Sequence, residues 1–184
     1  MTPLVKNPRF AAGAAAIVCA VSLFLGSTRS VGKLARDVRD MFYDGVPDTE
    51  QGYTRPSVDS QLQIRADAAG GLVTAAVKYA PVDELISART ALSSAGTIAE
   101  KSAANSELGK RFDELLDLLR NGGITIVERD AELIEAYAAE FRGSQGVIEA
   151  SGYNDAARNF SRTAKSFPVS VFTIDAVIDC PAVF

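Results

Sequence analysis

The stretch ERDAELIEAYAAEFRGSQGVIEASGYNDAARNFSRTAK, residues 128–165, decides how this chain folds. Apolar residues recur along it and just beyond it at spacings of three, four, seven or eight residues, which places them on one face of a helix: Leu133, Tyr137, Phe141, Ile148, Ala156, Phe160, Ala164 and Phe167. A single long helix cannot bury such a face alone, so other helices must fold back along it. The sequence therefore predicts an all-α fold, an antiparallel bundle with long helices and coiled-coil-like packing.

Three glycines interrupt this pattern. Gly143, Gly146 and Gly152 each cost a helix about 1 kcal/mol relative to alanine. One explanation is a local break in the helix, and the other is close packing of a neighbouring helix against the bare backbone. The sequence leaves both open.

Three more helices precede this stretch. The first begins at Pro56 and Ser57 and ends at Pro81, and the second follows with Asp83 and Glu84 in its first turn, where the helix dipole favours acids. The third ends at the turn-forming residues 121–123. The predicted apolar faces are Val58, Leu62, Ala69, Leu72, Ala76 and Ala80; then Val82, Leu85, Ile86 and Leu92; then Leu108, Phe112, Leu115 and Leu119.

Residues 124–127 (ITIV) have the composition of a strand but no partner strand, so they are predicted to lead into the last helix. We expect six side chains along the third and fourth helices to be largely buried: Phe112, Leu115, Tyr137, Phe141, Ile148 and Phe160.

The segment FAAGAAAIVCAVSLFLG, residues 10–26, is 17 residues long and carries no charge. That length reaches the lower limit for a membrane-spanning helix. Basic residues flank it on both sides: Lys6, Arg9, Arg29, Lys33, Arg36 and Arg39. We expect residues 1–27 to be a retained single-pass anchor in the cell membrane.

Two other interpretations of this segment stay open. A cleaved signal peptide would need a small-residue cleavage site, which residues 22–30 lack, and a buried core helix is the third interpretation. A lipoprotein is disfavoured because Val18 precedes Cys19. The larger number of bases after the segment predicts a cytoplasmic domain. The small residues Ala12, Ala16 and Ala20 leave open a homo-oligomer through the anchor.

Residues 28–56 connect this anchor to the bundle, which we assign to residues 57–184. Val31 to Phe42 is compatible with a helix that continues the anchor. Residues 43–56 (YDGVPDTEQGYTRP) contain two prolines and two glycines and are predicted to form a loop or broken helix.

Composition argues against several functions. The chain has no histidine, the usual general base and a common metal ligand, and its two cysteines, Cys19 and Cys180, are too few for a zinc site. The net charge of −4 disfavours nucleic-acid binding. The acids Asp113, Glu114 and Asp117 are best explained as a solvated helix face. We therefore predict no enzymatic activity, no metal and no cofactor.

A short serine–lysine pattern does not change this prediction. Residues 30–33 match the S-x-x-K nucleophile motif. That motif belongs to larger mixed α/β domains with further motifs, and Lys33 is explained by the positive charge that flanks an anchor.

Two segments carry a family resemblance. VDSQLQIRAD at residues 58–67, with Leu72–Val73 and Tyr79, is similar to V-D-x-Q-L-x-x-R-x-D. YNDAARNF at residues 153–160, with Phe167–Pro168 and a closing Pro181 and Phe184, is similar to Y-N-x-A-V-R-x-[YF] followed by F-P and P-x-x-F. In this order the motifs resemble the LemA family of bacterial membrane proteins, which implies an N-terminal membrane helix and an α-helical bundle but no general biochemical activity.

The chain departs from the family pattern in three places, as a divergent member would. Gly70–Gly71 stands where the family has Pro-Asn, residues 145–147 (QGV) stand where it has E-N-R, and Pro47 and Pro56 interrupt the usual continuation of the first helix.

The polar residues of these two segments are the candidate interaction residues. Asn154 and Arg158 are four residues apart and so share a helix face, whereas Asp59 and Arg65 do not. We expect such groups to form hydrogen-bond networks across helices that fix the helix register, rather than a ligand site. The set is Asp59, Gln61, Arg65, Asp67, Tyr153, Asn154, Arg158, Phe167 and Pro168.

These observations favour a membrane-anchored scaffold or adaptor that binds other proteins at the bacterial cell envelope. The alternative is a small-ligand sensor or enzyme-accessory protein that uses a cleft between helices. An exposed apolar groove would favour the adaptor, and a closed polar pocket with shifted ionisable groups would favour the sensor.

Overall fold

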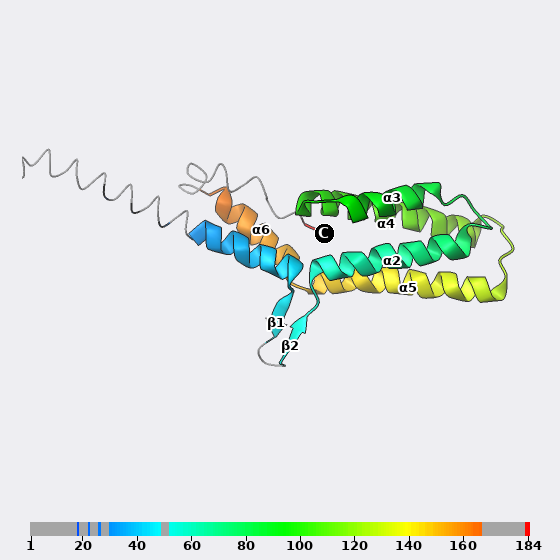
Figure 1. The fold of residues 1–184 in the computed structure, drawn as a ribbon, viewed down its shortest axis with the longest axis horizontal. Helices are drawn as coiled ribbons and strands as arrows, with labels where there is room; N and C mark the ends of the chain where they lie inside the picture. The colour runs from blue at the N-terminus through cyan, green and yellow to red at the C-terminus, as the bar shows by residue number, and fades with distance from the viewer. Residues whose placement is uncertain (1–17, 19–21, 23–25, 27–29, 49–51, 167–182) are drawn as a thin grey trace, which may run out of the picture.

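The computed structural model describes Val18, Ser22, Gly26 and residues 30–48, 52–166 and 183–184 (Figure 1). Within these residues the chain is predominantly α-helical, which confirms the predicted all-α class. The helices are residues 30–43, α2 (Val58–Ala76), α3 (Asp83–Ser94), α4 (Ile98–Asn121), α5 (Glu128–Ala150) and α6 (Tyr153–Ala164).

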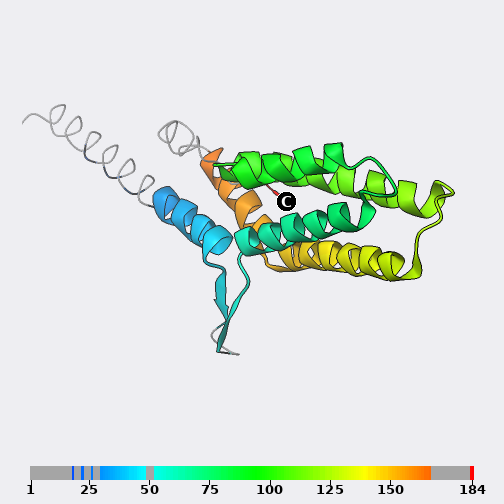
Figure 2. The same cartoon turned by 45° about the vertical axis from the view of Figure 1, so that its right-hand side comes forward.

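The helices α2 to α5 form a bundle of two pairs. α2 packs along α5, α3 packs along α4, and α2 also contacts α3 across the two pairs. Figure 2 shows the same pairing from a second side, with α6 and residues 30–43 at one end of the bundle. The predicted folding back of helices along the last long helix is therefore confirmed for α2 and α5.

Local sequence signals define the helix starts and ends. The Ser57 hydroxyl accepts a hydrogen bond from Ser60 N (3.1 Å) at the start of α2. Thr97 and Glu100 form a reciprocal capping box at the start of α4. Gly123, just past the end of α4, has φ +71°, the left-handed conformation that its sequence predicted.

The predicted apolar faces are largely correct. Every predicted residue of the α2 face and of the α4 face is buried, as are Val82, Leu85 and Leu92 around α3. Ile86 is the error, because it is 42% exposed. It follows Leu85 directly, and neighbouring residues on a helix point about 100° apart, so Ile86 lies beside the buried face of α3 and not on it.

The single helix predicted over residues 128–165 is wrong. The chain breaks after Ala150, and Gly152 adopts φ +79° before α6 begins. Gly143 and Gly146 stay inside α5, and a Cβ atom added at either would meet nothing within 4 Å. Of the two explanations for these glycines, the local break is therefore correct at Gly152, and close packing accounts for none of the three.

The break leaves most of the predicted face in place. Phe141, Ile148, Phe160 and Ala164 are buried, whereas Tyr137 and Ala156 are only partly buried and Leu133 is exposed. Leu133 precedes the buried Ile134, which takes the core position instead. Phe167 lies outside the described residues.

Close packing against a glycine does occur, at a position that the sequence did not single out for it. A Cβ atom added at Gly71 of α2 would overlap the ring of Tyr137 on α5. The glycine therefore lets the two helices approach with an aromatic ring between them.

A β-hairpin corrects the loop predicted for residues 43–56. β1 (Val46–Asp48) pairs antiparallel with β2 (Tyr53–Arg55), with Val46 opposite Arg55. Gly45 enters it with φ +82°, and a Cβ atom there would overlap the backbone oxygen of Arg55. Pro47 is tolerated in so short a ribbon, since neither strand is central in a sheet. Residues 124–127, by contrast, form no strand and lead into α5 as predicted.

The helix predicted over Val31 to Phe42 is confirmed, since residues 30–43 are helical. The predicted anchor at residues 10–26 falls outside the described residues, except for Val18, Ser22 and Gly26. In the part of the chain that is described, no helix combines the length and the apolar character needed to cross a membrane.

Candidate functional site

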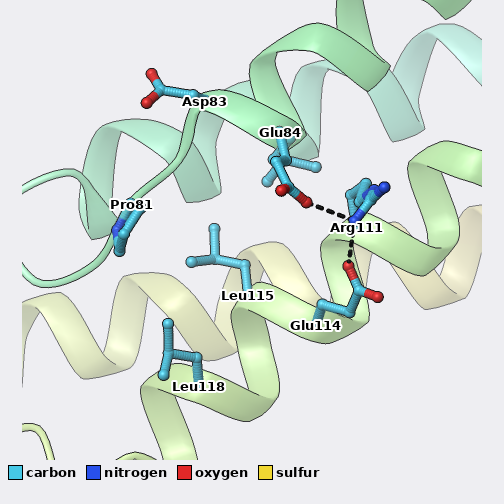
Figure 3. A pocket seen from close by; sticks show the side chains of 8 residues that line it. Pro81, Asp83, Glu84, Arg111, Glu114, Leu115 and Leu118 are labelled. Carbon is cyan, nitrogen blue, oxygen red and sulfur yellow. Dashed lines mark hydrogen bonds and ion pairs between the residues drawn. The ribbon is translucent and has the colours of Figure 1, made fainter.

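A solvent-open groove of about 400 Å³ lies between the start of α3 and the middle of α4 (Figure 3). Pro81, Asp83, Glu84, Leu85, Arg111, Glu114, Leu115 and Leu118 line it. A second recess of about 440 Å³ shares Asp83, Glu84 and Arg111 with it and extends along Ser87, Ala88, Ala91 and Glu107. We call the two together the α3–α4 groove.

The groove combines an apolar floor with an acidic rim. Leu85 and Leu115 are core residues whose edges reach the groove, and Leu118 is 41% exposed within it. Asp83 and Glu84 belong to the first turn of α3, where the helix dipole stabilises their negative charge. Apolar surface beside carboxylates suits a ligand that is both apolar and cationic.

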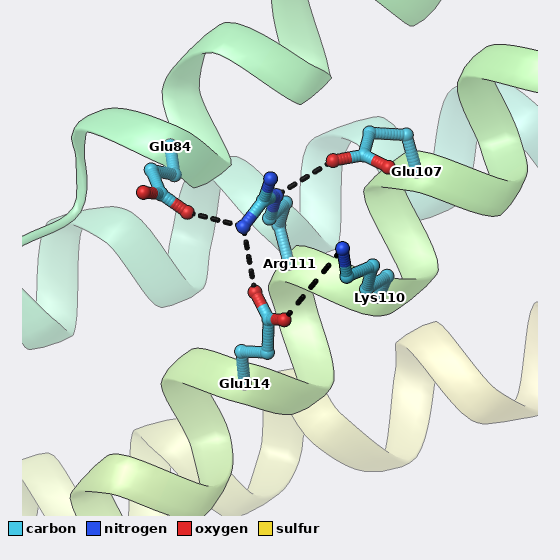
Figure 4. A network of polar contacts seen from close by, with 5 residues as sticks. All are labelled: Glu84, Glu107, Lys110, Arg111 and Glu114. Atoms are coloured by element: carbon cyan, nitrogen blue, oxygen red, sulfur yellow. Dashed lines mark hydrogen bonds and ion pairs between the residues drawn. The ribbon is translucent and has the colours of Figure 1, made fainter.

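Arg111 is the central cation of the groove (Figure 4). Its Nε donates to Glu107 Oε1 (2.6 Å) and its Nη1 donates to Glu114 Oε2 (2.9 Å), both on α4. Nη1 also pairs with Glu84, so the guanidinium links α4 to α3. The hydrogen bonds from Glu107 and then Glu114 raise the pKa of Arg111 above its ordinary value, which keeps it charged.

Sequence reasoning missed Arg111 and Glu107. The signal was present, because Glu107 and Arg111 are four residues apart and Glu114 lies three residues further on, so all three share one helix face. The contact with Glu84, 27 positions away, depends on how α3 folds back on α4 and has no local signal.

Arg65 is buried at the centre of the bundle, with 4% of its surface exposed. Its Nε donates to Asn105 Oδ1 on α4 (2.7 Å) and its Nη1 donates to the carbonyl oxygen of Phe141 on α5 (2.9 Å). Its guanidinium carbon lies 3.8 Å from the centroid of the Phe141 ring, which stacks on Phe112. Burial lowers the pKa of Arg65 to about 10 despite the attraction of Asp113 and Glu149.

The predicted contacts of Arg65 to other helices are therefore observed, and they join α2, α4 and α5. Asp67 fits the prediction only in part. Its Oδ1 accepts from Gln63 on its own helix (3.1 Å) and lies 3.9 Å from Arg89 of α3. Asp59 forms an ion pair with Lys101, which ties α2 to α4, and Gln61 is buried.

The second predicted segment divides differently. Tyr153 is fully buried, and Asn154, 8% exposed, bonds the backbone of Phe184. Arg158 contradicts the prediction, because it is exposed and its contact is Asp155 on its own helix (3.1 Å). Asn154 and Arg158 are four residues apart on α6, yet only Asn154 is buried in the core. Phe167 and Pro168 lie outside the described residues.

A polar cluster at the far end of the bundle joins the turn after α2 to the first turn of α5. Tyr79 donates to Asp130 Oδ2 (2.6 Å), and Lys78 pairs with the same carboxylate. The hydrogen bonds from Lys78 and then Tyr79 lower the pKa of Asp130. Over the described residues, His, Cys, Asp and Glu form no cluster of three or more that could hold a metal ion.

Comparisons of the chain with protein families, with curated proteins and with solved structures found no match.

Proposed function

We propose that this chain is a non-enzymatic, membrane-tethered scaffold that docks a basic, amphipathic segment of a partner protein in the α3–α4 groove. One observation carries the proposal, namely the open groove with leucines on its floor and carboxylates along its rim. The residues that line it include four acids, Asp83, Glu84, Glu107 and Glu114, and one cation, Arg111. A partner with lysine or arginine flanking apolar side chains complements both features.

The shape of the groove supports an adaptor over a small-ligand sensor. Sensors generally enclose most of their ligand in a concave pocket, whereas this groove lies open along two helices. Leu118 and the edge of Leu115 offer apolar area to a helix or extended segment. The rim would steer a basic partner and set its orientation.

The tether rests on residues 10–26. An uncharged run of 17 residues between basic flanks supports a single-pass anchor, and the two motif segments support a LemA-like protein at a bacterial envelope. The larger number of bases after the run supports a bundle on the cytoplasmic side. Cell fractionation tests the tether: the intact chain should resist carbonate extraction, and a soluble form starting after residue 26 would refute the anchor.

Site-specific photo-crosslinking in the native membrane tests the groove. A benzophenone amino acid replaces Leu118 in one full-length variant and Val147, equally exposed on α5, in the control. We expect Leu118 alone to capture a defined protein, through a peptide that carries lysine or arginine. Glu84→Lys and Glu114→Lys should each reduce the capture. Equal capture from Val147, or capture that survives both charge reversals, would refute docking in this groove.

A further inference from the structure

The segment Val183–Phe184 occupies a site built by three separate helices. The ring of Phe184 lies 5.5 Å from that of Phe42, in the helix of residues 30–43, and 5.9 Å from that of Tyr153 on α6. The Ser102 hydroxyl on α4 donates to the carbonyl oxygen of Val183 (2.8 Å). The segment is thus held by elements that lie far apart in the sequence.

The side-chain amide of Asn154 forms two hydrogen bonds with the backbone of this segment, one through its nitrogen and one through its oxygen. Its Nδ2 donates to the Phe184 carbonyl oxygen (2.8 Å), and its Oδ1 accepts from Phe184 N (2.9 Å). A side-chain amide that pairs with both backbone groups of one residue reproduces the hydrogen bonds that a neighbouring β-strand would make. Asn154 is itself more than nine-tenths buried, and its two hydrogen bonds to Phe184 are partly buried.

The aromatic wall and the amide together have the features of a peptide-binding site. Phe42 and Tyr153 are fully buried and supply the apolar surface that accepts an aromatic side chain. Asn154 and Ser102 supply backbone recognition. All of these contacts come from two consecutive residues, Val183 and Phe184, so a separate peptide of the same sequence can make all of them.

We infer that Asn154, Ser102, Phe42 and Tyr153 form a binding site for a peptide segment that carries phenylalanine, and that Val183–Phe184 is its internal ligand. When Val183–Phe184 occupies the site, Phe184 contacts Phe42 of the helix of residues 30–43 and Tyr153 of α6, and Val183 contacts Ser102 of α4. This site is separate from the α3–α4 groove, so the inference stands without the proposed function. The internal ligand competes with any added peptide because a linked segment has a high effective concentration.

Peptide titration of the full-length chain in detergent tests the site. The probe is a fluorescent peptide matching residues 177–184 with serine in place of Cys180. Phe184→Ala, which removes the internal aromatic ligand, should bind the probe at least about tenfold more tightly than the parent chain. Adding Asn154→Ala should weaken that binding about tenfold or more, whereas adding Arg158→Ala on the same helix should leave it unchanged.

Two results would overturn the inference. One is a folded Phe184→Ala chain, judged by circular dichroism, that does not bind the probe. The other applies if Phe184→Ala unfolds. Phe184→Leu, which keeps an apolar side chain but removes the ring, then replaces it, and a probe with benzophenone in place of phenylalanine is added in excess to that folded variant. Crosslinking to α6 or to residues 30–43 that unlabelled peptide suppresses supports the site, and its absence refutes it.

Discussion

We call the packed interface of α2 with α5, together with the α4 residues that contact it, the seam, and we call the surface that carries the α3–α4 groove the face. Each is organised around one arginine, and the two arginines have opposite surroundings. Arg65 in the seam is 4% exposed and bonds an amide, a backbone carbonyl and a ring. Arg111 on the face has a side chain 28% exposed and meets three carboxylates. Arg111 therefore has charged partners at the surface, whereas Arg65 has uncharged partners in the core.

This difference predicts unequal contributions of the two arginines to stability. Ion pairs in contact with water contribute little to stability, because the charges are solvated with or without their partners. A buried hydrogen bond is costly to lose, since its partner stays buried and unsatisfied. Arg65 thus stabilises the fold, whereas Arg111 lies on the exposed surface where we propose that a partner docks.

The largest effect should come from the ring that Arg65 covers. Phe141→Ala removes a buried side chain that stacks on Phe112 and leaves a cavity in the seam. We expect a loss of about 3–5 kcal/mol in the free energy of unfolding, measured with urea. Leu133→Ala, exposed on the same helix, is the control and should cost far less. Equal losses from the two would mean that the seam is not the core.

The hydrogen-bonded residues Arg65 and Asn105 should affect the free energy of unfolding as a pair. Arg65→Met leaves Asn105 buried without its partner, and Asn105→Leu leaves Arg65 Nε without its acceptor. Each single change should cost about 2–3 kcal/mol. The double variant should recover most of that loss, because an apolar pair of similar volume removes both buried polar groups. Additive losses in the urea titrations would show that the two residues do not act together.

Sequence reasoning predicted those features of the bundle that follow from a local pattern of residues. The faces of α2 and α4 follow from a helical period, and the end of α4 follows from its glycines. The partners of Arg65 lie 40 and 76 positions away, so the prediction of contact with other helices could name neither. The hairpin and the break at Gly152 depend on how the surrounding elements pack, which overrides a weak local propensity.

Two glycines test how tightly the seam is packed. Gly71→Ala places a methyl group against the ring of Tyr137 and should cost about 1–3 kcal/mol of unfolding free energy. Gly143→Ala in α5 meets open space in a helical conformation, so it should stabilise the chain by up to about 1 kcal/mol. Opposite shifts in thermal midpoint are the expected result. Stabilisation by both would mean that Tyr137 moves aside at no cost.

Acid should weaken the far end of the seam in a defined direction. The folded pKa of Asp130 is depressed below its ordinary value of 3.8 by Lys78 and Tyr79. Its stabilising contribution is therefore present above that ordinary value and is lost as the pH falls through the folded pKa. Asp130→Asn should lower the urea midpoint at about pH 7, and the difference from the parent should shrink towards about pH 3. If the difference in urea midpoint did not change with pH, ionisation of the Asp130 carboxylate would not be the cause of the stabilisation.

The smallest effect on stability should come from Arg111, despite its three ionic partners. Arg111→Gln removes a cation from a solvated surface, so the urea midpoint should stay within error of the parent, and added salt should leave that result unchanged. The same change removes positive charge between Glu84, Glu107 and Glu114, so the groove becomes more acidic. Capture of a basic partner through Leu118 should therefore increase or persist, whereas Glu84→Lys reduces it. Arg111→Gln could instead destabilise the domain as much as Arg65→Met does. The exposed and the buried arginine would then contribute equally to stability, and the contrast between the seam and the face would be wrong.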